Sequence, residues 1–404
     1  MEYVPPHRIS LKSEDGESIQ IARSLLDHSL VFKDLLNDEN LNVLNISENY
    51  QRLLQMKRFL ETGDPKLTSL ENRFEMYEFG IIYEIRRLQK FCRESLISFI
   101  NVKNVCQIYD FAYKYEDRRI QYHCWKTFDD FSEEILQSEE FTRCQEATIE
   151  TFVSRPKYKT LKEIDLFDSI VSWAKSHHSE AVSNDGNLPE NEDIRNYLAA
   201  YLNKIRFLSM STEELDIVFS QNILSSEEVR GILEYQKQGI LTKLPDTICP
   251  SISMRNKQCY GQLMEYLNRH THKFWKVKKF GKKSGFYSSF IPKLDCFLIG
   301  VVIPIIHQEQ RLCVLIEINV SSESLPTAEY SCSQIGEISL SEPLFIKKGT
   351  EVFISGKIRS KQQNHTIKIA KNAEYYTTDQ NVHHSLFYGY NKCINYFIKA
   401  RLYF

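Results

Sequence analysis

The spacing of apolar residues changes once along the chain, near residue 240. Between about residues 50 and 236, apolar positions recur at steps of three or four, as in Phe74, Tyr77, Ile81, Ile85 and Leu88. This spacing predicts amphipathic helices, and the breaks between them are polar or contain glycine and proline. We therefore expect a stack of short helical hairpins in this part of the chain.

Beyond residue 240 the apolar residues alternate with polar ones. In the segment 394–404 the even-numbered residues are apolar, whereas Lys399 and Arg401 lie between them, which predicts a strand with one buried face. Further strands are expected in the Val-, Ile- and Phe-rich segments 296–306, 312–320, 351–358 and 365–370. Several strands without helices between them predict an antiparallel sandwich or barrel.

The first 50 residues combine both patterns. Residues 8–11 and 18–21 flank the dipeptide Asp15-Gly16, which is typical of a hairpin turn. A helix is expected over residues 22–36 and another strand over 42–46. The predicted order is therefore hairpin, helix, strand, and then the helical hairpins.

Composition narrows the class of protein. The chain has 404 residues, of which 51 are basic and 53 acidic, so its net charge of −2 excludes a globally basic nucleic-acid-binding protein or an acidic disordered tail. At 42% hydrophobic residues it can build packed cores, and its length corresponds to roughly three domains. It shows neither a signal peptide nor an apolar run of transmembrane length, and its ten cysteines form no C-x-x-C pair. These features favour a cytoplasmic protein with reduced thiols.

Motifs for catalysis, cofactors or metals are not found. The sequence contains no G-x-G-x-x-G, H-E-x-x-H or G-x-S-x-G, and Gly281-Lys-Lys-Ser-Gly lacks the earlier glycine of a phosphate-binding loop because position 276 is lysine. Paired carboxylates occur at expected helix starts: Ser211 with Glu214 has the spacing of a capping box, and Ser225 begins a similar sequence. We therefore predict no catalytic, cofactor-binding or metal-binding residues and expect a protein that is not an enzyme and needs no cofactor.

One charged segment stands out in the C-terminal part. Lysines alternate with aromatic residues there, and the cluster comprises Lys276, Lys278, Lys279, Lys282 and Lys283. Such a cluster could bind single-stranded nucleic acid, or it could be a strand whose lysines face water. No comparable basic stripe follows elsewhere in this part, which favours an acidic protein partner over nucleic acid or membrane.

The sequence resembles the BTB–BACK–PHR family over nearly its whole length. The stretch from Ile21-Ala-Arg-Ser-Leu-Leu to Leu36 resembles the BTB pattern of a strand running into the helix that ends at a core phenylalanine, and Phe59-Leu-Glu-Thr-Gly63 resembles the family's F-L-Y-T-G. Tyr83-x-Ile85-x-x-Leu88-x-x-x-Cys92 matches its Y-x-I-x-x-L-x-x-x-C helix. These spacings identify the N-terminal part as BTB-like.

The following parts resemble BACK and PHR domains. Leu161-Lys-Glu163, the pair Leu166-Phe167 and Trp173 are similar to a BACK pattern, as is Ile205-Arg-Phe-Leu-Ser-Met210 followed by two glutamates. In the C-terminal third, 295–301 and Leu340-Ser-Glu-Pro343 resemble strands of the PHR β-sandwich. The resemblance implies an α+β multidomain chain with a BTB/POZ-like domain (1–100), a BACK helical domain (101–236), a linker (237–268) and a PHR-like β-sandwich (269–404).

The resemblance implies that the protein acts as an adaptor between a ubiquitin ligase and its substrate. BTB–BACK–PHR proteins bind a cullin through the BTB domain and first BACK helices, and recruit a substrate for ubiquitination through the sandwich; the BTB domain also forms homodimers. The contact with the cullin would involve the helix ending near residue 36 and the loop after it, with the candidate residues Phe32, Leu35, Leu36, Asp38 and Tyr83. The alternative is a scaffold that binds proteins without a cullin.

Overall fold

The computed structural model describes the greater part of the chain. The described residues are 7–37, 41–181, 191–239, 244–255, 274–277, 285–303, 305–307, 312–321, 323–324, 326–358, 367–370, 382–383, 395–397 and 399–403. They divide into two compact units, Met1–Tyr115 and Glu116–Phe404, so helices after residue 116 share a unit with the C-terminal strands.

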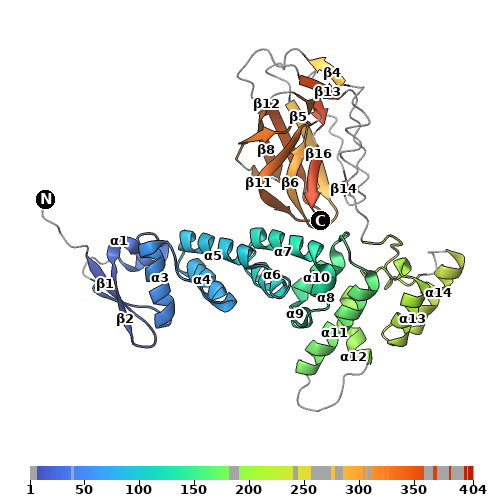
Figure 1. The fold of residues 1–404 in the computed structure, drawn as a ribbon, viewed down its shortest axis with the longest axis horizontal. Coiled ribbons are helices and arrows are strands. Elements are labelled where there is room, and N and C mark those ends of the chain that lie inside the picture. Colours follow the sequence, from blue (N-terminus) through green and yellow to red (C-terminus); the bar gives the residue numbers. More distant parts are fainter. Residues whose placement is uncertain are drawn as a thin grey trace. The chain divides into compact units, whose positions relative to one another are not determined.

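The first unit begins with a small mixed sheet. Strands β1 (Arg8–Lys12) and β2 (Ser18–Ala22) form the expected hairpin, whose turn residue Gly16 has φ +86°, a conformation that favours glycine. Strand β3 (Val43–Asn45) pairs in parallel with β1, which gives the order β2-β1-β3. The hairpin and the helix α3 beside it are visible at the N-terminal end in Figure 1.

The helix expected over residues 22–36 is interrupted, so this prediction was wrong in detail. The structure has two short helices instead, α1 (Arg23–Leu26) and α2 (Leu30–Leu35). The break occurs because the Ser29 hydroxyl accepts a hydrogen bond of 3.0 Å from the backbone N–H of Phe32 and thereby caps α2. As the N-cap, Ser29 has an extended backbone (φ −115°, ψ 127°), so it cannot continue α1.

A series of helices follows, as the spacing predicted. In the first unit these are α3 (Tyr50–Thr62), α4 (Leu70–Ile82), α5 (Arg86–Phe99) and α6 (Val105–Lys114). The second unit contains α7 (Arg118–Asp130), α8 (Ser132–Leu136), α9 (Glu139–Thr142), α10 (Glu146–Ser154), α11 (Glu163–Ala181), α12 (Asn191–Leu202), η1 (Phe207–Ser209), α13 (Thr212–Ser220) and α14 (Ser226–Gln238). Both expected capping boxes, at the starts of α13 and α14, are confirmed.

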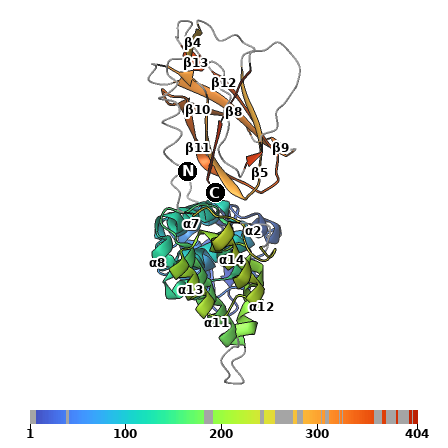
Figure 2. The ribbon, with the colours of Figure 1, turned by 90° about the vertical axis from the view of Figure 1, so that its right-hand side faces the viewer.

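The C-terminal strands form sheets packed as a sandwich, which confirms the predicted class. They are β4 (Phe274–Val277), β5 (Gly285–Pro292), β6 (Cys296–Val302), β7 (Ile305–Ile306), β8 (Leu312–Val320), β9 (Glu323–Ser324), β10 (Ala328–Cys332), β11 (Glu337–Ile346), β12 (Val352–Ile358), β13 (Ile367–Ala370), β14 (Val382–His383), β15 (Asn395–Phe397) and β16 (Lys399–Tyr403). One sheet has the order β10-β8-β12-β5-β14 and another β11-β6-β16. Figure 2 labels β10, β8, β12 and β5 of the first sheet and β11 of the second.

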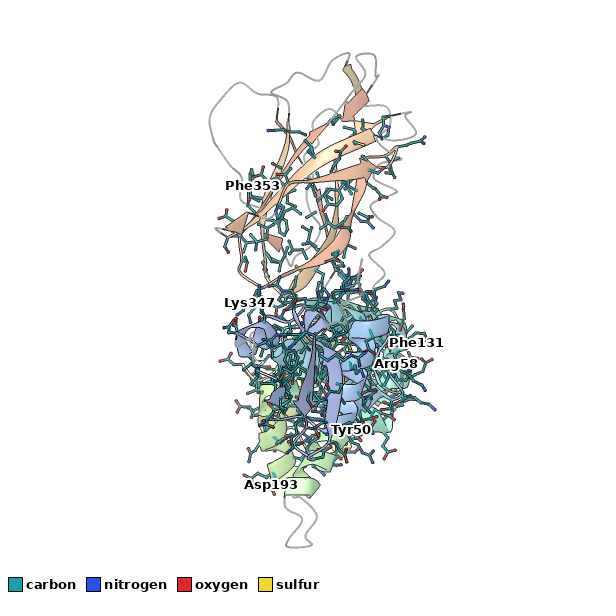
Figure 3. All side chains as sticks on the ribbon, turned by 90° about the vertical axis from the view of Figure 1, so that its left-hand side faces the viewer. Tyr50, Arg58, Phe131, Asp193, Lys347 and Phe353 are labelled. Atoms are coloured by element: carbon teal, nitrogen blue, oxygen red, sulfur yellow. The ribbon has the colours of Figure 1, made fainter. Side chains whose placement is uncertain are left out.

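The sandwich core comes from alternate residues of these strands. On β12, Val352 and Ile354 are fully buried, whereas Phe353 (labelled in Figure 3) is partly exposed. The expected single strand over 394–404 is two strands that join different sheets, since β15 pairs in parallel with β5 and β16 pairs antiparallel with β6. That expectation was therefore wrong in detail.

Candidate partner-binding surfaces

Helix α2 separates buried from exposed apolar residues. Phe32 is 0% exposed and Leu36, just after the helix, is 7% exposed, whereas Leu30 and Leu35 are 52% and 47% exposed. A six-residue helix with apolar residues on both sides can bury only one of them. Leu30 and Leu35 therefore form the apolar surface that α2 presents outside the core of the first unit.

Phe32 and Tyr83 pack against each other on the buried side of α2. Their rings are stacked, with centroids 4.9 Å apart and planes inclined by 7°. The Ser29 hydroxyl donates a hydrogen bond to the main-chain carbonyl of Tyr83, so both the cap and the core of α2 contact the turn after α4. Burial raises the pKa of the Tyr83 hydroxyl to about 12, which keeps it neutral. These two candidate residues lie together, inside the unit.

The loop after α2 is held at both ends by one arginine. The guanidinium of Arg23 donates hydrogen bonds to the main-chain carbonyls of Leu36 and of Leu41, the latter at 3.4 Å. Asp38, the acidic residue proposed for a partner contact, lies outside the described residues. Of the five candidate residues in this region, only Leu35 is both described and exposed.

The lysine cluster is described at one position only. Lys276 lies on β4 opposite Lys368 of β13, so its main chain is part of a small sheet with the order β4-β13-β7. Lys278, Lys279, Lys282 and Lys283 lie outside the described residues. The proposed role of the cluster in binding a partner stays a prediction.

A buried arginine organises the helices of the second unit. Arg255 is 2% exposed, and its Nε lies 3.0 and 2.9 Å from the two carboxylate oxygens of Glu163 at the start of α11. Its other nitrogens donate to the main-chain carbonyls of Arg155 and, at 2.7 Å, of Lys204. Burying a guanidinium is unfavourable unless it is paired, and here each nitrogen has a partner. Residue 255 thus ties a segment expected to be linker into the helical core.

Arg206 supports the same region through its guanidinium and its backbone. It donates to the main-chain carbonyls of Ser253 at 2.9 Å and Pro156 at 3.1 Å. Its own backbone N–H donates to Glu163 at 2.8 Å. Burial, together with the neighbouring charge of Arg255, lowers the pKa of Arg206 to about 10. The main-chain carbonyls of Ser253 and Pro156 accept hydrogen bonds from the Arg206 guanidinium and so offset part of the repulsion between Arg206 and Arg255.

Aromatic residues join α7 to the sandwich within the second unit. Trp125 meets Phe297 of β6 edge-on, with ring centroids 5.1 Å apart. The Tyr403 hydroxyl, on β16, lies 3.3 Å from both the main-chain carbonyl of Trp125 and a carboxylate oxygen of Asp129. The Arg155 guanidinium lies 5.4 Å from the centre of the Tyr403 ring. Burial raises the pKa of Asp129. The sandwich is therefore packed directly on a helix.

In the described part of the chain, neither a metal-binding group nor a membrane-spanning helix is found, and the paired carboxylates noted in the sequence lie at helix starts. No group of three or more His, Cys, Asp or Glu residues there could hold a metal ion. The carboxylates singled out from the sequence act as caps, since Glu214 and Glu228 each bind the backbone N–H of the serine three residues earlier. No helix in the described segments is long and apolar enough to cross a membrane.

Comparison with known proteins identifies one domain. Residues 105–185 match the family model BACK, described as "BTB And C-terminal Kelch", and the α/β region before them is consistent with a BTB domain. The search of curated proteins found no match. One solved structure, a family GH115 4-O-methyl-alpha-glucuronidase, aligns at 8% identity over 87% of this chain and 48% of its own. Its TM-score is 0.15, and the chain spans about half the length of that protein.

Proposed function

We propose that this chain, in which a BACK domain follows a BTB-like α/β region, is a non-enzymatic adaptor that recruits substrates to a cullin RING ubiquitin ligase. The observation that carries the proposal is this order of domains, because BTB–BACK proteins are typically cullin adaptors and are generally not enzymes. An adaptor needs surfaces with a few apolar anchors rather than a catalytic cluster. The carboxylates that act as helix caps agree with this role.

The cullin contact is proposed on α2 and the loop after it. Leu35 and its exposed neighbour Leu30 supply apolar area that a partner could bury, while Phe32 and Tyr83 keep the helix rigid beneath them. A rigid anchor loses little conformational freedom on binding. Of the candidate residues, we therefore assign the direct contact to Leu35 and a supporting role to Phe32, Leu36 and Tyr83.

The substrate-binding arm is proposed to be the PHR-like sandwich. It is the part of the chain with loops at the ends of packed strands, where recognition commonly resides. Its attachment to α7 through Trp125, Phe297 and Tyr403 would hold those loops in a constant orientation to the helices of the second unit. The lysine cluster around β4 is the proposed acidic-partner surface of this arm.

A cullin-independent scaffold is the second candidate function, and one observation favours it. The family's contact loop offers a hydrophobic residue followed after one position by glutamate, and here Leu36-Asn37-Asp38 stands in its place. The Leu36 side chain is buried, so the hydrophobic member of that motif is not presented to a partner. A chain with this loop could retain its protein-binding arm and lose the ligase.

Capture of the N-terminal domain of a cullin by the full chain tests the proposal. Leu35→Asp should weaken capture at least tenfold, roughly 1.4 kcal/mol, because it places a charge in a desolvated contact. Its unfolding midpoint should stay unchanged, since Leu35 is largely exposed. The matched control is Ile217→Asp on α13, a residue of similar exposure, which should change neither quantity.

Leu36→Asp provides the structural reference. Because Leu36 is buried, this variant should lose several kcal/mol of stability, roughly the cost of a buried unpaired charge. If the folded wild-type chain never captures a cullin, the adaptor function is refuted and the scaffold function is retained. If Leu35→Asp and Ile217→Asp capture equally well, the contact lies elsewhere than α2.

A further inference from the structure

Three cations crowd the start of α5 in the first unit. Arg86 and Arg87 are its first two residues and Lys90 lies one turn further, and all three side chains are exposed. On a helix, residues three and four positions apart are neighbours, so Lys90 lies beside both arginines. Among the described residues, none of these cations forms an ion pair or hydrogen bond.

Two other cations of the same unit form ion pairs. Arg52 on α3 lies 3.0 Å from Glu48 and 3.3 Å from Glu75, and Lys114 on α6 lies 3.5 Å from Glu78. Two acidic residues lie close in sequence to the α5 cations: Glu84, which is exposed and pairs with no described residue, and Glu94, which lies one turn after Lys90 on α5. Arg86, Arg87 and Lys90 are thus three neighbouring exposed cations without an ion pair among the described residues, in a chain whose net charge is −2.

Their position on the helix opposes folding. The N-terminal end of a helix carries a partial positive charge, so cations there are unfavourable and acids are favourable. Helices α13 and α14 follow this rule with two glutamates each in the first turn, whereas α5 has no acid in its first turn and no side-chain cap at Ile85. Local stability alone would select the opposite charges here, and a binding partner that supplies negative charge would offset the cost.

An apolar residue lies next to these cations. Ile82, at the end of α4, is 58% exposed and is separated from Arg86 by a three-residue turn in which Glu84 has φ +49°. An exposed isoleucine adds nothing to the binding of a bare polyanion, but it suits a peptide that carries both acidic and apolar side chains. Charge complementarity and this apolar neighbour together favour a protein segment over nucleic acid.

We infer that the surface formed by Ile82, Arg86, Arg87 and Lys90 binds an acidic, amphipathic segment of a partner protein. The inference goes beyond the proposed function, because it defines the chemistry of the partner segment without requiring the partner to be a cullin. Complementary charges would accelerate association and make the affinity sensitive to salt. The positive end of α5 would add to the attraction for acidic side chains.

The probe is a fluorescent helical peptide of about 20 residues with glutamates on one face and leucines on the other, long enough to be helical. Its binding to the full chain is measured by anisotropy at low and physiological salt. The triple variant Arg86→Glu/Arg87→Glu/Lys90→Glu should weaken binding at least tenfold and remove most of the salt dependence. The control Lys103→Glu/Arg230→Glu/Lys237→Glu reverses the same number of exposed charges elsewhere and should change affinity less than twofold.

Thermal unfolding separates binding from folding. The triple variant should unfold at the same or a higher temperature than wild type, because glutamates suit the start of a helix. The inference is overturned if the peptide fails to bind, if the two triple variants weaken it equally, or if a glutamine version of the peptide binds as well. It is also overturned if single-stranded DNA or phosphatidylserine vesicles bind the wild type more tightly than the peptide. Because the probe is not a cullin, these outcomes are independent of cullin capture through Leu35.

Discussion

Two groups of cations, one in each unit, differ in burial and in their partners. In the second unit, the guanidinium of Arg255 is buried and contacts Glu163 and two main-chain carbonyls. In the first unit, Arg86, Arg87 and Lys90 are exposed at the positive end of a helix and form no ion pair or side-chain hydrogen bond with the described residues. A buried charge without partners would prevent folding, whereas an exposed one costs little and stays free to bind. Arg255 therefore stabilises the fold, whereas Arg86, Arg87 and Lys90 are available to bind a partner.

Removing the buried pair should have the largest effect. We expect Arg255→Ala to lose about 3–5 kcal/mol of unfolding free energy, because Glu163 would be left charged and buried. Urea unfolding followed by fluorescence measures this loss. The double variant Arg255→Met/Glu163→Gln should recover part of it, since neither partner is then charged. If Arg255→Ala were as stable as wild type, the pair would not hold the 248–255 segment to the helices.

A partly buried pair should give a smaller effect that depends on pH. Burial opposes ionisation of Glu228, but hydrogen bonds from Arg195, Thr247 and the backbone of Ser225 outweigh it and lower its pKa to about 2. A carboxylate with a lowered pKa stabilises the fold above its ordinary value of 4.5, and this contribution is lost as the pH falls towards 2. The loss should be on the order of 2 kcal/mol after solvent screening.

Acid titration of unfolding free energy measures that contribution. In Glu228→Gln the same interval of pH should show a shallower loss of stability than in wild type. The matched control is Glu227→Gln at the adjacent position. The Glu227 side chain is exposed, so this substitution should leave the dependence of stability on pH unchanged. Identical acid profiles for wild type and Glu228→Gln would show that the Arg195 pair does not contribute to folding.

The sequence predicted most elements but could not assign each apolar residue to core or surface. In Leu-Val-Phe-Lys-Asp-Leu-Leu of α2, both Leu35 and Leu36 fit an amphipathic pattern, and only the tertiary packing shows that Leu36 is buried and Leu35 exposed. The cap by Ser29, which ends the expected long helix, was also overlooked. It could have been recognised because serine three residues before Phe32 is a common helix start.

Contacts between distant residues were the least predictable part. Glu163 and Arg206 were noted from their sequence patterns, but Arg255 lay in an expected linker, and nothing local indicates that it returns to α11 over 92 residues. Tyr403 is an odd-numbered residue, on the face that Lys399 and Arg401 were expected to expose to water, yet it is 8% exposed and its hydroxyl has a buried partner. That partner, Asp129, is 274 residues away. Periodicity describes the face of an element and carries no information about which other element it meets.

The smallest predicted effect is a change in unfolding free energy whose sign should differ between a cation at the start of a helix, Arg87, and one at the end of a helix, Lys114. Arg87→Glu should raise the unfolding free energy by about 0.3–1 kcal/mol, because it replaces a cation with an anion at the positive end of α5. The same substitution at Lys114, in the last turn of α6, should lower it by a similar amount, since cations suit that end and Lys114 also pairs with Glu78. Chemical unfolding of both variants at low salt gives the comparison. A loss of stability in Arg87→Glu would mean that the α5 cations serve the fold, and only a gain is compatible with their retention for a partner.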